Sequence, residues 1–322
     1  MEYCQLGRSG LTVSRLCLGT LNFGFNTPEP ESHAIMDHAL DLGINHFDTS
    51  DVYGQFPGEP TESATERIIG RWFAKGGRRR ERTVIGTKVY EPISSWPNDG
   101  RLSALHIRRA CDASLERLQT DYVDIYQMHH IDRRTPWDEI WEAMDVLRAQ
   151  GKILYIGSSN FAGWHLAQAQ EAALARSMLG IVSEQSIYNL ATRDIEREVL
   201  PAAEAYGIGV MAWSPLHRGM LAGILGSDVA GTRYRPAQLE AHRGQLEKYE
   251  AMCGEIGVAP ARVALAWLLS RPGITSPVIG PRAEEDLDSA VAALDVQLDV
   301  SVLGRLDAIF PGYRTAPEDY AW

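Results

Sequence analysis

The sequence predicts an α/β fold in which eight parallel strands close into a barrel surrounded by helices. Short apolar runs alternate with segments of helical periodicity along nearly the whole chain, and eight such strand–helix units can be counted. Near-continuous apolar strands indicate parallel strands buried on both faces, and eight is the number that closes into a (β/α)8 TIM barrel. A chain of 322 residues fits one such barrel, so we expect a single domain over residues 1–322.

The expected strands are short runs rich in apolar residues. Each is followed by a turn with polar residues or glycine and then by a helical pattern, which is the order of a strand–helix unit. The eight runs are residues 16–20, 44–48, 83–88, 122–128, 153–158, 181–184, 209–213 and 275–279.

The helical segments are marked by apolar side chains three and four positions apart and by residues that favour helix ends. Ser63 and Glu66 form a capping-box pattern at the start of the second helix, and Pro136 suits the first turn of the fourth. Pro201 should break or kink the sixth helix, because proline lacks the N–H that a helix interior requires. The expected helices are residues 35–43, 63–76, 107–118, 135–151, 163–176, 194–206, 260–270 and one that begins near residue 284.

An open, doubly wound sheet is the alternative arrangement for the same order of elements. The first strand is followed by residues 19–24, which lack the G-x-G-x-x-G spacing and do not open a helix at once, so that fold is not indicated. Between residues 216 and 257 the chain leaves the strand–helix rhythm, with a helix expected around residues 238–253. A long loop after the seventh strand of a barrel lies over the carboxyl-terminal rim, so we interpret it as a cover for cofactor or substrate.

Composition argues against several classes of partner. The formal net charge is −11, and the one dense basic cluster, residues 78–82, is interrupted by Glu81, so no nucleic acid is expected as a partner. The four cysteines are scattered and no secretory apolar region follows Met1, so we expect a reduced, cytoplasmic protein. No window approaches the roughly 18 apolar residues of a membrane span, so no membrane partner is expected. The sequence leaves the oligomeric state open.

Four polar side chains recur at the same phase of the strand–helix pattern. Asp48 ends the second strand, Tyr53 follows it in a glycine-bounded loop, Lys88 closes the third strand, and His129 follows the fourth. The carboxyl ends of barrel strands share one rim, where barrel enzymes carry their chemistry. A phenol with an ordinary pKa of about 10 needs a nearby cation to act as an acid at neutral pH, and Lys88 can supply it. We therefore expect these four side chains to lie together.

The order and spacing of several motifs resemble those of the aldo-keto reductase family over nearly the whole chain. The motifs are Asp48-x4-Tyr53-Gly54, Thr87-Lys88, Tyr122-Val123-Asp124-x4-His129, Ile156-Gly157-x-Ser159-Asn160-Phe161, Gln185 and Trp213-Ser214-Pro215-Leu216. The resemblance implies a barrel that binds a nicotinamide nucleotide without a Rossmann domain. The nucleotide is usually NADP(H), with NAD(H) as the alternative, and the substrate is an aldehyde or ketone that is reduced to an alcohol.

By this resemblance Tyr53 is the general acid that protonates the carbonyl oxygen as hydride arrives from the cofactor. Lys88 should lower the pKa of the phenol, and Asp48 should pair with Lys88 and hold it in place. His129 should hydrogen-bond the substrate oxygen and orient it, as an oxyanion-hole donor does. His130 is the second choice, since the family motif has its histidine directly after the strand, where His129 stands.

The resemblance also implies a cofactor set. Ser159, Asn160 and Gln185 correspond to the groups that hold the nicotinamide carboxamide, and Trp213 corresponds to an aromatic side chain stacked beneath the ring. The residues of a turn implied to cradle the pyrophosphate, near Arg218, are Ser214, Leu216, Gly219 and Leu221.

Two further cofactor residues, Gly280 and Arg282, follow the eighth strand. Arg282 matches a position that is commonly basic for the 2′-phosphate of NADPH. This end of the chain departs from the family pattern, which weakens the implied preference for NADPH over NADH. The departing residues are Glu285, Asp286 and Ala290.

Other interpretations remain beside these. Taken singly, Asp48, Lys88 and His129 are more typical of a cap, a surface charge and a satisfied histidine than of catalysis, and only their joint placement reverses that balance. No metal is expected, because no H-x-H follows the first strand and Lys88 would repel a metal ion. The side chains that a metal-dependent barrel hydrolase could use are Asp48, Asp51, His129, His130 and Asp132.

A nucleotide-binding regulatory subunit is another alternative, since some relatives of this fold modulate channels. The intact set of aspartate, tyrosine, lysine and histidine argues against it. The small-molecule carbonyl substrate is open, and the polar, glycine-rich loops suggest sugars or bulky polyketide-like ketones as a hypothesis.

Overall fold

Eight parallel strands form a closed barrel in the computed structural model, which describes residues 1–54, 64–226 and 236–321, with the backbone alone for residues 236–238. Neighbouring strands pair in the order β10-β3-β4-β5-β6-β7-β8-β9, and every pairing is parallel. The predicted TIM barrel is confirmed. Its strands are β3 (Cys17–Gly19), β4 (His46–Asp48), β5 (Val84–Val89), β6 (Val123–Met128), β7 (Ile153–Ser159), β8 (Ile181–Ile187), β9 (Gly209–Trp213) and β10 (Ile274–Ile279).

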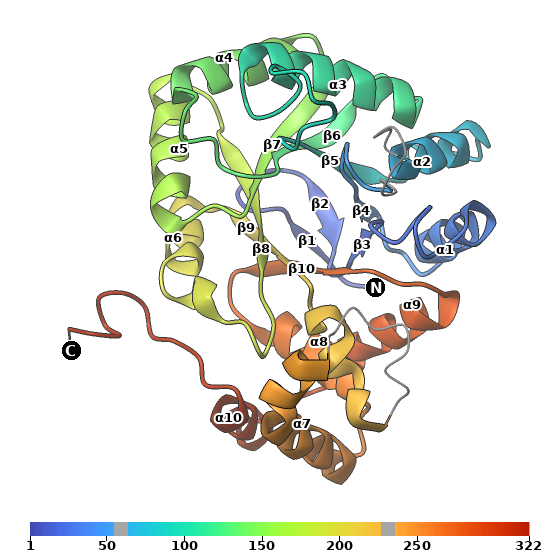
Figure 1. Ribbon diagram of the computed structural model, residues 1–322, viewed down its shortest axis with the longest axis vertical. Helices are drawn as coiled ribbons and strands as arrows, with labels where there is room; N and C mark the ends of the chain where they lie inside the picture. Colours follow the sequence, from blue (N-terminus) through green and yellow to red (C-terminus); the bar gives the residue numbers. More distant parts are fainter. Residues whose placement is uncertain (55–63, 227–235, 322) are drawn as a thin grey trace.

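Helices surround the barrel in the predicted alternation with strands (Figure 1). Their apolar faces pack against the strands, and the large side chains of Trp72, Trp141 and Trp267 are fully buried in the main core. The α-helices are α1 (Glu29–Asp41), α2 (Ala64–Ala74), α3 (Ala104–Leu118), α4 (Trp137–Ala149), α5 (Gly163–Ala175), α6 (Val199–Tyr206), α7 (Pro236–Ile256), α8 (Pro260–Ser270), α9 (Glu284–Val291) and α10 (Val300–Ile309). The 3-10 turns are η1 (Asp194–Glu196), η2 (His217–Ala222), η3 (Ile224–Gly226) and η4 (Ala292–Asp295).

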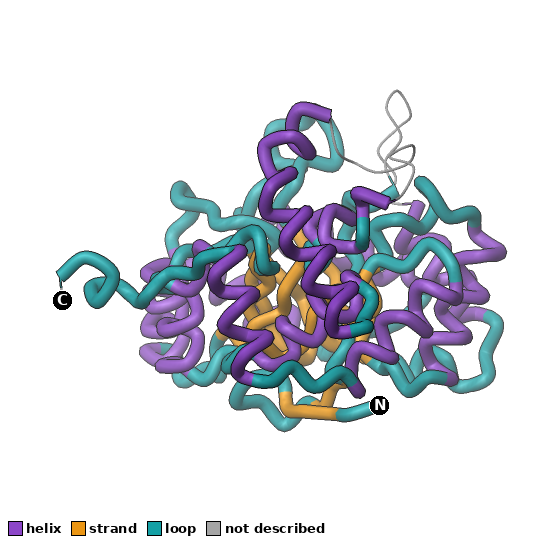
Figure 2. Tube along the Cα trace, turned by 90° about the horizontal axis from the view of Figure 1, so that it is seen from below, coloured by secondary structure: helices purple, strands orange, loops and turns teal. Residues whose placement is uncertain are grey.

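An antiparallel hairpin closes the amino-terminal end of the barrel. β1 (Tyr3–Gln5) pairs with β2 (Thr12–Ser14), and Figure 2 shows the hairpin beneath the barrel strands beside the N-terminus. Leu6 of the hairpin is fully buried and packs with Ile125 and Val182 from the barrel. This hairpin is not predicted from the sequence, because strands of three residues are too short to show a periodic pattern.

The sixth helical segment is broken, but the break lies before the proline that predicts it. The turn η1 ends at Glu196, and α6 begins at Val199. Pro201 is therefore the third residue of α6 and lies in the first helical turn. A proline there removes no intrahelical hydrogen bond, because the first N–H groups of a helix have no partner within it.

The segment after β9 contains more regular structure than a loop. It holds η2, η3 and the 21-residue helix α7, which includes the helix predicted for residues 238–253. Met220 and Leu221 of η2 are fully buried in the main core. The described parts of this segment therefore pack onto the barrel. Residues 227–235, which are part of the predicted cover, lie outside the described residues.

Helix α2 approaches α3 closely because a glycine lies at their contact. A Cβ on Gly70 would lie 2.1 Å from the carbonyl oxygen of Arg117. On the same helix, the buried carboxylate of Glu66 accepts hydrogen bonds from Thr87 (2.5 Å) and Arg117 (2.7 Å). The partner of Glu66 in the predicted capping box, Ser63, lies outside the described residues.

No single helix in the described ranges has both the length and the apolar character needed to cross a membrane. One pair of helical segments, Leu239–Ile256 and Pro260–Ser270, meets the test together by length and composition only, and it is bent by 92°.

We expect Gly70→Ala to destabilise the protein by about 2–3 kcal/mol, because the added methyl group must push α2 and α3 apart. The matched control is Gly244→Ala in α7, where a Cβ would meet nothing within 4 Å. Alanine at that exposed helical position should stabilise the protein by about 0.5–1 kcal/mol. Urea unfolding measures both changes, and an unaltered midpoint for Gly70→Ala would contradict the close contact.

Candidate active site

The ammonium group of Lys88 lies at the centre of the candidate site. Lys88 is fully buried near the end of β5, and its Nζ donates to Asp48 Oδ2 (2.6 Å), Thr49 O (2.8 Å) and Tyr53 OH (3.2 Å). Three acceptors satisfy all three N–H bonds of a protonated lysine. Burial has the largest single effect on the pKa of Lys88 and would lower it, but the charges and hydrogen bonds of Asp48 and Tyr53 together outweigh burial, so the pKa is raised. The side chain therefore remains charged.

The chain after β4 carries the phenol to this ammonium group. The amide of Thr49 donates to Gly86 O (2.8 Å), which extends the pairing of β4 with β5 beyond the strand. The chain then turns at Gly54, which has φ +81° and lies so close to α2 that a Cβ would clash with it. The turn leaves the ring of Tyr53 4.8 Å from Lys88 Nζ, measured to the ring centroid.

Two glutamines hold the second oxygen of Asp48. The side-chain amides of Gln127 (2.9 Å) and Gln185 (2.8 Å) both donate to Asp48 Oδ1, while Lys88 binds Oδ2. The carboxylate thus accepts three side-chain hydrogen bonds from β5, β6 and β8, which satisfies a buried charge and fixes its position.

Gln127 is not among the site residues predicted from the sequence. Glycines make room for it inside the barrel: a Cβ would lie 3.1 Å from Gln127 Nε2 if built on Gly86, and 2.9 Å from Gln127 Cγ if built on Gly157. A polar amide within an otherwise apolar strand, two positions before His129 and so on the same face of β6, is the signal that could have identified it.

His129 directly follows β6 and lies half-buried beside the phenol. Its ring is edge-on to Tyr53 with centroids 6.0 Å apart, and its Nδ1 lies 3.3 Å from Ser50 Oγ. Burial lowers the pKa of His129 to about 2, and the charges of Lys88 and His130 act in the same direction. The imidazole is therefore neutral at physiological pH and carries one ring hydrogen.

His130, the second choice for the substrate-orienting role, stacks on His129 with ring centroids 5.1 Å apart. Its Nε2 lies 3.2 Å from Glu91 Oε1, and its ring is edge-on to Tyr90. His129 is thus the histidine in ring contact with Tyr53.

The pKa of Tyr53 is raised above its ordinary value, although Lys88 acts on it in the expected, lowering direction. Burial has the largest effect and disfavours the phenolate, and the charge of Lys88 opposes burial without cancelling it. The hydroxyl group therefore keeps its proton at neutral pH, which is the state that a general acid requires.

The residues predicted to hold the nicotinamide carboxamide lie together at the ends of neighbouring strands. Ser159 Oγ donates to Gln185 O (2.8 Å) and accepts from Asn160 Nδ2 (3.0 Å). Asn160 Nδ2 also donates to His129 O (3.2 Å), and Asn160 Oδ1 accepts from Trp213 Nε1 (3.2 Å). Asn160 adopts φ +59°, a left-handed conformation that asparagine tolerates better than most residues.

These groups fit a nicotinamide ring with its carboxamide. The side-chain NH2 group of Gln185 donates to Asp48. The side-chain carbonyl of Gln185 can therefore accept a hydrogen bond from a carboxamide N–H. Trp213 is half-buried at the end of β9 with its indole N–H fixed by Asn160, so a flat apolar face is held in one orientation.

The turn predicted to cradle the pyrophosphate is closed by its own hydrogen bonds. The amides of Gly219 (2.9 Å) and Leu221 (3.1 Å) both donate to Leu216 O, and Ser214 O accepts from the Asn189 side chain (3.0 Å). Two of the backbone donors that the prediction assigns to the phosphates are therefore already paired in this conformation.

Gly280 and Arg282 follow β10 and are exposed. Gly280 O accepts from Asn22 Nδ2 (2.9 Å), which ties this loop to the loop after β3. The amide of Arg282 donates to Asp286 Oδ2 (2.9 Å). One of the acidic residues that depart from the family pattern thus lies directly beside the predicted 2′-phosphate arginine.

Across residues 1–54, 64–226 and 236–321, no group of three or more His, Cys, Asp or Glu side chains is placed to hold a metal ion. Asp48, which the hydrolase alternative would use, faces the Lys88 ammonium group at 2.6 Å. A metal ion beside Asp48 would therefore meet a buried positive charge.

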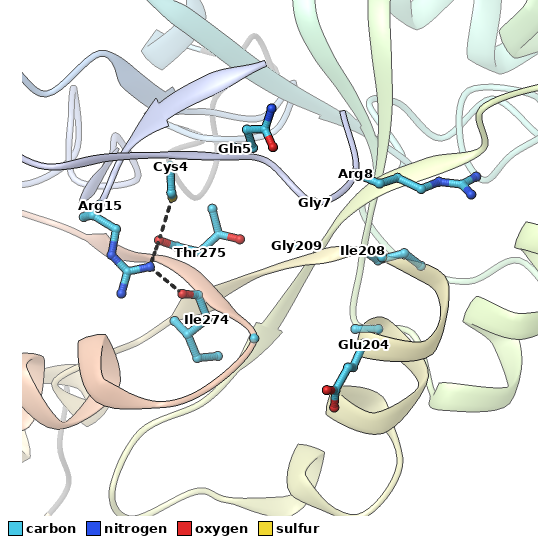
Figure 3. Close-up of a pocket in the computed structure, with 13 residues that line it drawn as sticks. Cys4, Gln5, Gly7, Arg8, Arg15, Glu204, Ile208, Gly209, Ile274 and Thr275 are labelled. Atoms are coloured by element: carbon cyan, nitrogen blue, oxygen red, sulfur yellow. Dashed lines mark hydrogen bonds between the residues drawn. The ribbon is translucent and has the colours of Figure 1, made fainter. Parts of the chain in front are cut away.

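The opposite end of the barrel carries a concavity of about 370 Å³ at the starts of β9 and β10 (Figure 3). Arg15 lines it, but the guanidinium donates to the carbonyl oxygens of Ile274 (2.8 Å), Thr275 (3.0 Å) and Leu269 (2.8 Å). This arginine therefore joins the hairpin region to the strand ends, and the chemistry described above lies at the other rim.

Comparison with known proteins agrees with this geometry. The family model described as the Aldo/keto reductase family matches residues 15–310. The chain belongs to the aldo/keto reductase family. This aldo/keto reductase is accordingly an enzyme of the oxidoreductase class, in a family that generally reduces carbonyl compounds with NADP(H).

Several proteins are similar to this chain over their full length. The aldo/keto reductase is 54% identical over 330 positions to an uncharacterized oxidoreductase, YrpG, of Bacillus subtilis, covering 100% of both chains. It is 34% identical to versiconal hemiacetal acetate reductase of Aspergillus parasiticus, covering 98% of this chain and 100% of that one. It is 32% identical to a probable voltage-gated potassium channel subunit beta of Oryza sativa subsp. japonica, covering 99% of this chain and 100% of that one.

Glu184, which is not among the site residues predicted from the sequence, is a buried carboxyl group that supports the loop of Asn160. It accepts hydrogen bonds from the Phe161 amide (3.1 Å), Ser186 Oγ (2.7 Å) and Ser158 Oγ (2.5 Å). Burial raises the pKa of Glu184 to about 7, and these hydrogen bonds offset only part of that effect. The carboxyl group is therefore half-protonated near neutral pH.

Because the pKa of Glu184 is raised in the folded state, ionisation of this group costs stability as the pH rises from its ordinary pKa of 4.5 to about 7. Glu184→Gln cannot ionise, so the stability of the variant relative to the parent should increase by roughly 3 kcal/mol between about pH 4.5 and about pH 8. Urea unfolding at both pH values tests this. Glu142→Gln, at an exposed position of α4, is the control and should show no such trend. If the free energy of unfolding of Glu184→Gln differed from that of the parent by the same amount at both pH values, the raised pKa would be contradicted.

Proposed function

We propose that this enzyme reduces an aldehyde or ketone to an alcohol with NADPH and that Tyr53 supplies the proton. The observation that carries the proposal is the 3.2 Å hydrogen bond from Lys88 Nζ to the Tyr53 hydroxyl, at the barrel rim where Ser159, Asn160 and Trp213 also lie. Membership of an oxidoreductase family whose members generally reduce carbonyl compounds supports it.

Tyr53 is the acid in this mechanism. When bound, reduced nicotinamide supplies the hydride that forms the new C–H bond. The carbonyl oxygen gains negative charge in that reaction, and the Tyr53 hydroxyl neutralises it by transferring its proton. The phenolate that remains lies beside Lys88 Nζ, whose own charge is balanced by Asp48. The ion pair thus stabilises the buried phenolate and does not itself lose a proton.

His129 orients the carbonyl group. A neutral imidazole cannot protonate the substrate, but it can donate its one ring hydrogen to the carbonyl oxygen. A donor already aimed at the position where charge develops stabilises the transition state without reorganisation. The hydrogen bond from Asn160 to His129 O and the contact with Ser50 hold the histidine for that purpose.

The nucleotide is held by residues on β7, β8 and β9 and the loops that follow. We propose that Ser159, Asn160 and Gln185 bind the carboxamide and that Trp213 packs against one face of the nicotinamide ring. The proposed contacts with the rest of the nucleotide involve Ser214, Leu216, Gly219, Leu221, Gly280 and Arg282. Because the Gly219 and Leu221 amides already donate to Leu216 O, these residues contribute through other groups or after the turn rearranges.

The substrate class that we favour is a bulky or polyhydroxylated carbonyl compound. The support is the polar, glycine-containing sequence that starts at Tyr53, of which residues 55–63 lie outside the described residues, and the 34% identity to versiconal hemiacetal acetate reductase. We also propose a cytoplasmic location, since a reducing compartment suits four cysteines that are all free thiols.

A cofactor-binding regulatory role is the second candidate function. It is favoured by the 32% identity to a probable channel subunit beta. Such a protein would bind NADPH without turnover, whereas the hydrogen-bonded set of Asp48, Lys88 and Tyr53 supports catalysis. Turnover of any carbonyl substrate separates the two candidates.

Tyr53→Phe should bind NADPH with unchanged affinity and lower kcat/KM for carbonyl reduction on the order of 10³-fold, because it removes the acid and keeps the ring. Fluorescence titration measures binding, and the absorbance of reduced nicotinamide measures turnover. Tyr206→Phe removes a hydroxyl that bonds Glu171 on the outer helices and serves as the control with full activity. Activity of Tyr53→Phe equal to that of the control would exclude Tyr53 as the proton donor.

Arg282→Ala should weaken NADPH binding by about 10-fold or more, with little effect on NADH, because only NADPH carries the 2′-phosphate that the guanidinium can pair with. Fluorescence titration with each nucleotide measures how much affinity the variant loses for NADPH and for NADH. Arg148→Ala, an exposed position on α4, is the charge-matched control. Equal losses for both nucleotides would remove the assigned role of Arg282.

A further inference from the structure

The hydroxyl group of Ser50 lies between a buried carboxyl group and the histidine of the site. Ser50 Oγ is 3.1 Å from Asp51 Oδ1 and 3.3 Å from His129 Nδ1. Asp51 is buried, and within the described part of the chain its other oxygen, Oδ2, has no hydrogen-bond partner. Asp51 has no role in the proposed mechanism, and Ser50 enters it only through its contact with His129.

A serine hydroxyl has one hydrogen, so it can donate to Asp51 or to His129 but not to both. If Asp51 is ionised, it accepts the hydrogen of Ser50, and Ser50 Oγ must then accept from a hydrogen on His129 Nδ1. If Asp51 is protonated on Oδ1, it donates to Ser50, and Ser50 donates to an unprotonated Nδ1. The single ring hydrogen of His129 is then on Nε2.

We propose that Asp51 acts through Ser50 as a positioning residue that selects the tautomer of His129, and that protonated Asp51 sets the tautomer that can donate from Nε2 to a carbonyl substrate. The inference rests on the proposed function for its consequence in catalysis. The hydrogen-bond coupling itself depends only on the three side chains.

The surroundings of Asp51 allow both states near the working pH. Burial, followed by the charge of Glu66 on α2, raises the pKa of Asp51 to about 8, and the Ser50 hydrogen bond, Arg117 on α3 and Lys88 on β5 offset part of that rise. Among the described residues, Tyr53 and Tyr126 are further titratable groups that interact with Asp51.

Those other groups do not titrate in the same range. The pKa values of Lys88 and Tyr53 are raised from their ordinary values of 10.5 and 10.0, and that of Tyr126 is raised well above 10.0. The imidazole of His129 stays neutral because its pKa is lowered to about 2. A change near pH 8 in the hydrogen position on His129 therefore reports Asp51.

The switch conserves hydrogens. When Asp51 ionises, one proton leaves for solvent, the Ser50 hydroxyl turns to Asp51, and the ring hydrogen of His129 moves from Nε2 to Nδ1 with no change in the charge of the ring. Above the pKa of Asp51 the substrate oxygen then meets a lone pair on Nε2 in place of a donor. Loss of one oxyanion-hole donor lowers the rate on the order of 100-fold.

Nitrogen-15 NMR of the full-length protein labelled at histidine tests the coupling without substrate. The two ring nitrogens of a neutral imidazole give distinct shifts, and the signals of His129 are identified by their loss in His129→Gln. We expect hydrogen on Nε2 at about pH 6.5 and on Nδ1 at about pH 9.5. One unchanged tautomer across this range in the parent protein would overturn the proposal.

Variants of Asp51 and Ser50 separate the coupling from a structural effect. The asparagine of Asp51→Asn cannot ionise. In this variant, neither the tautomer of His129 nor kcat/KM should change as the pH passes through about 8. Ser50→Ala cuts the connection and should also abolish the pH dependence of the tautomer. Asp124→Asn is the control: Asp124 is another buried carboxyl with a raised pKa, but it pairs with Arg80 and should leave the step in place.

Activity measurements distinguish failure of this inference from failure of the proposed function. In the parent enzyme, kcat/KM for carbonyl reduction should fall as the pH rises through about 8, and the fall should coincide with the tautomer change. A tautomer change without turnover at any pH would leave the coupling in place and reject the reductase. A fall in activity that persists in Asp51→Asn would reject the coupling.

Discussion

Burial of the Lys88 ammonium group inside the barrel is the constraint on which the rest of the site depends. An isolated charge in a protein interior costs several kcal/mol, so every N–H of the group needs an acceptor. Asp48, the Thr49 carbonyl and Tyr53 supply them. Asp48 in turn needs donors for its second oxygen, which come from two glutamine amides on other strands. Removing any one of these groups leaves a buried donor, acceptor or charge unsatisfied, so β4, β5, β6 and β8 form one cooperative unit around the lysine.

The same constraint determines what the phenol can do. Burial stabilises the protonated form of Tyr53, and the neighbouring ammonium group stabilises the ionised form that a proton transfer would leave. Tyr53 must keep its proton until a substrate is bound and then transfer it. Burial favours the first condition, and the ammonium group of Lys88 favours the second. Hydrogen bonds also fix the neighbouring residues of the rim. Asn160 bonds both the indole N–H of Trp213 and the backbone carbonyl of His129.

Buried carboxyl groups behave differently at three places in this fold because their partners differ. Asp48 has a lysine ammonium group at 2.6 Å and forms an ion pair. Glu184 has hydroxyl and amide donors only, and its pKa rises to about 7. Asp51 lies near both Glu66 and Arg117, and its pKa rises to about 8. Burial therefore raises the pKa of Glu184 and Asp51 toward neutral pH, since the hydrogen-bond donors to these two groups in the described residues are uncharged.

The sequence by itself determined the eight strand–helix units and the placement of Asp48, Lys88 and His129 at strand ends, because apolar periodicity is a local property and barrel closure follows from the number of units. The tertiary structure alone decided the rest. That Gln127 reaches Asp48 and that the pKa of Tyr53 rises depend on atoms contributed by distant strands and loops. The pairing of the turn amides after β9 with Leu216 O depends on the backbone conformation that the turn adopts in the fold. Hydrogen-bond direction and burial are set by such non-local contacts, and no spacing along the chain encodes them.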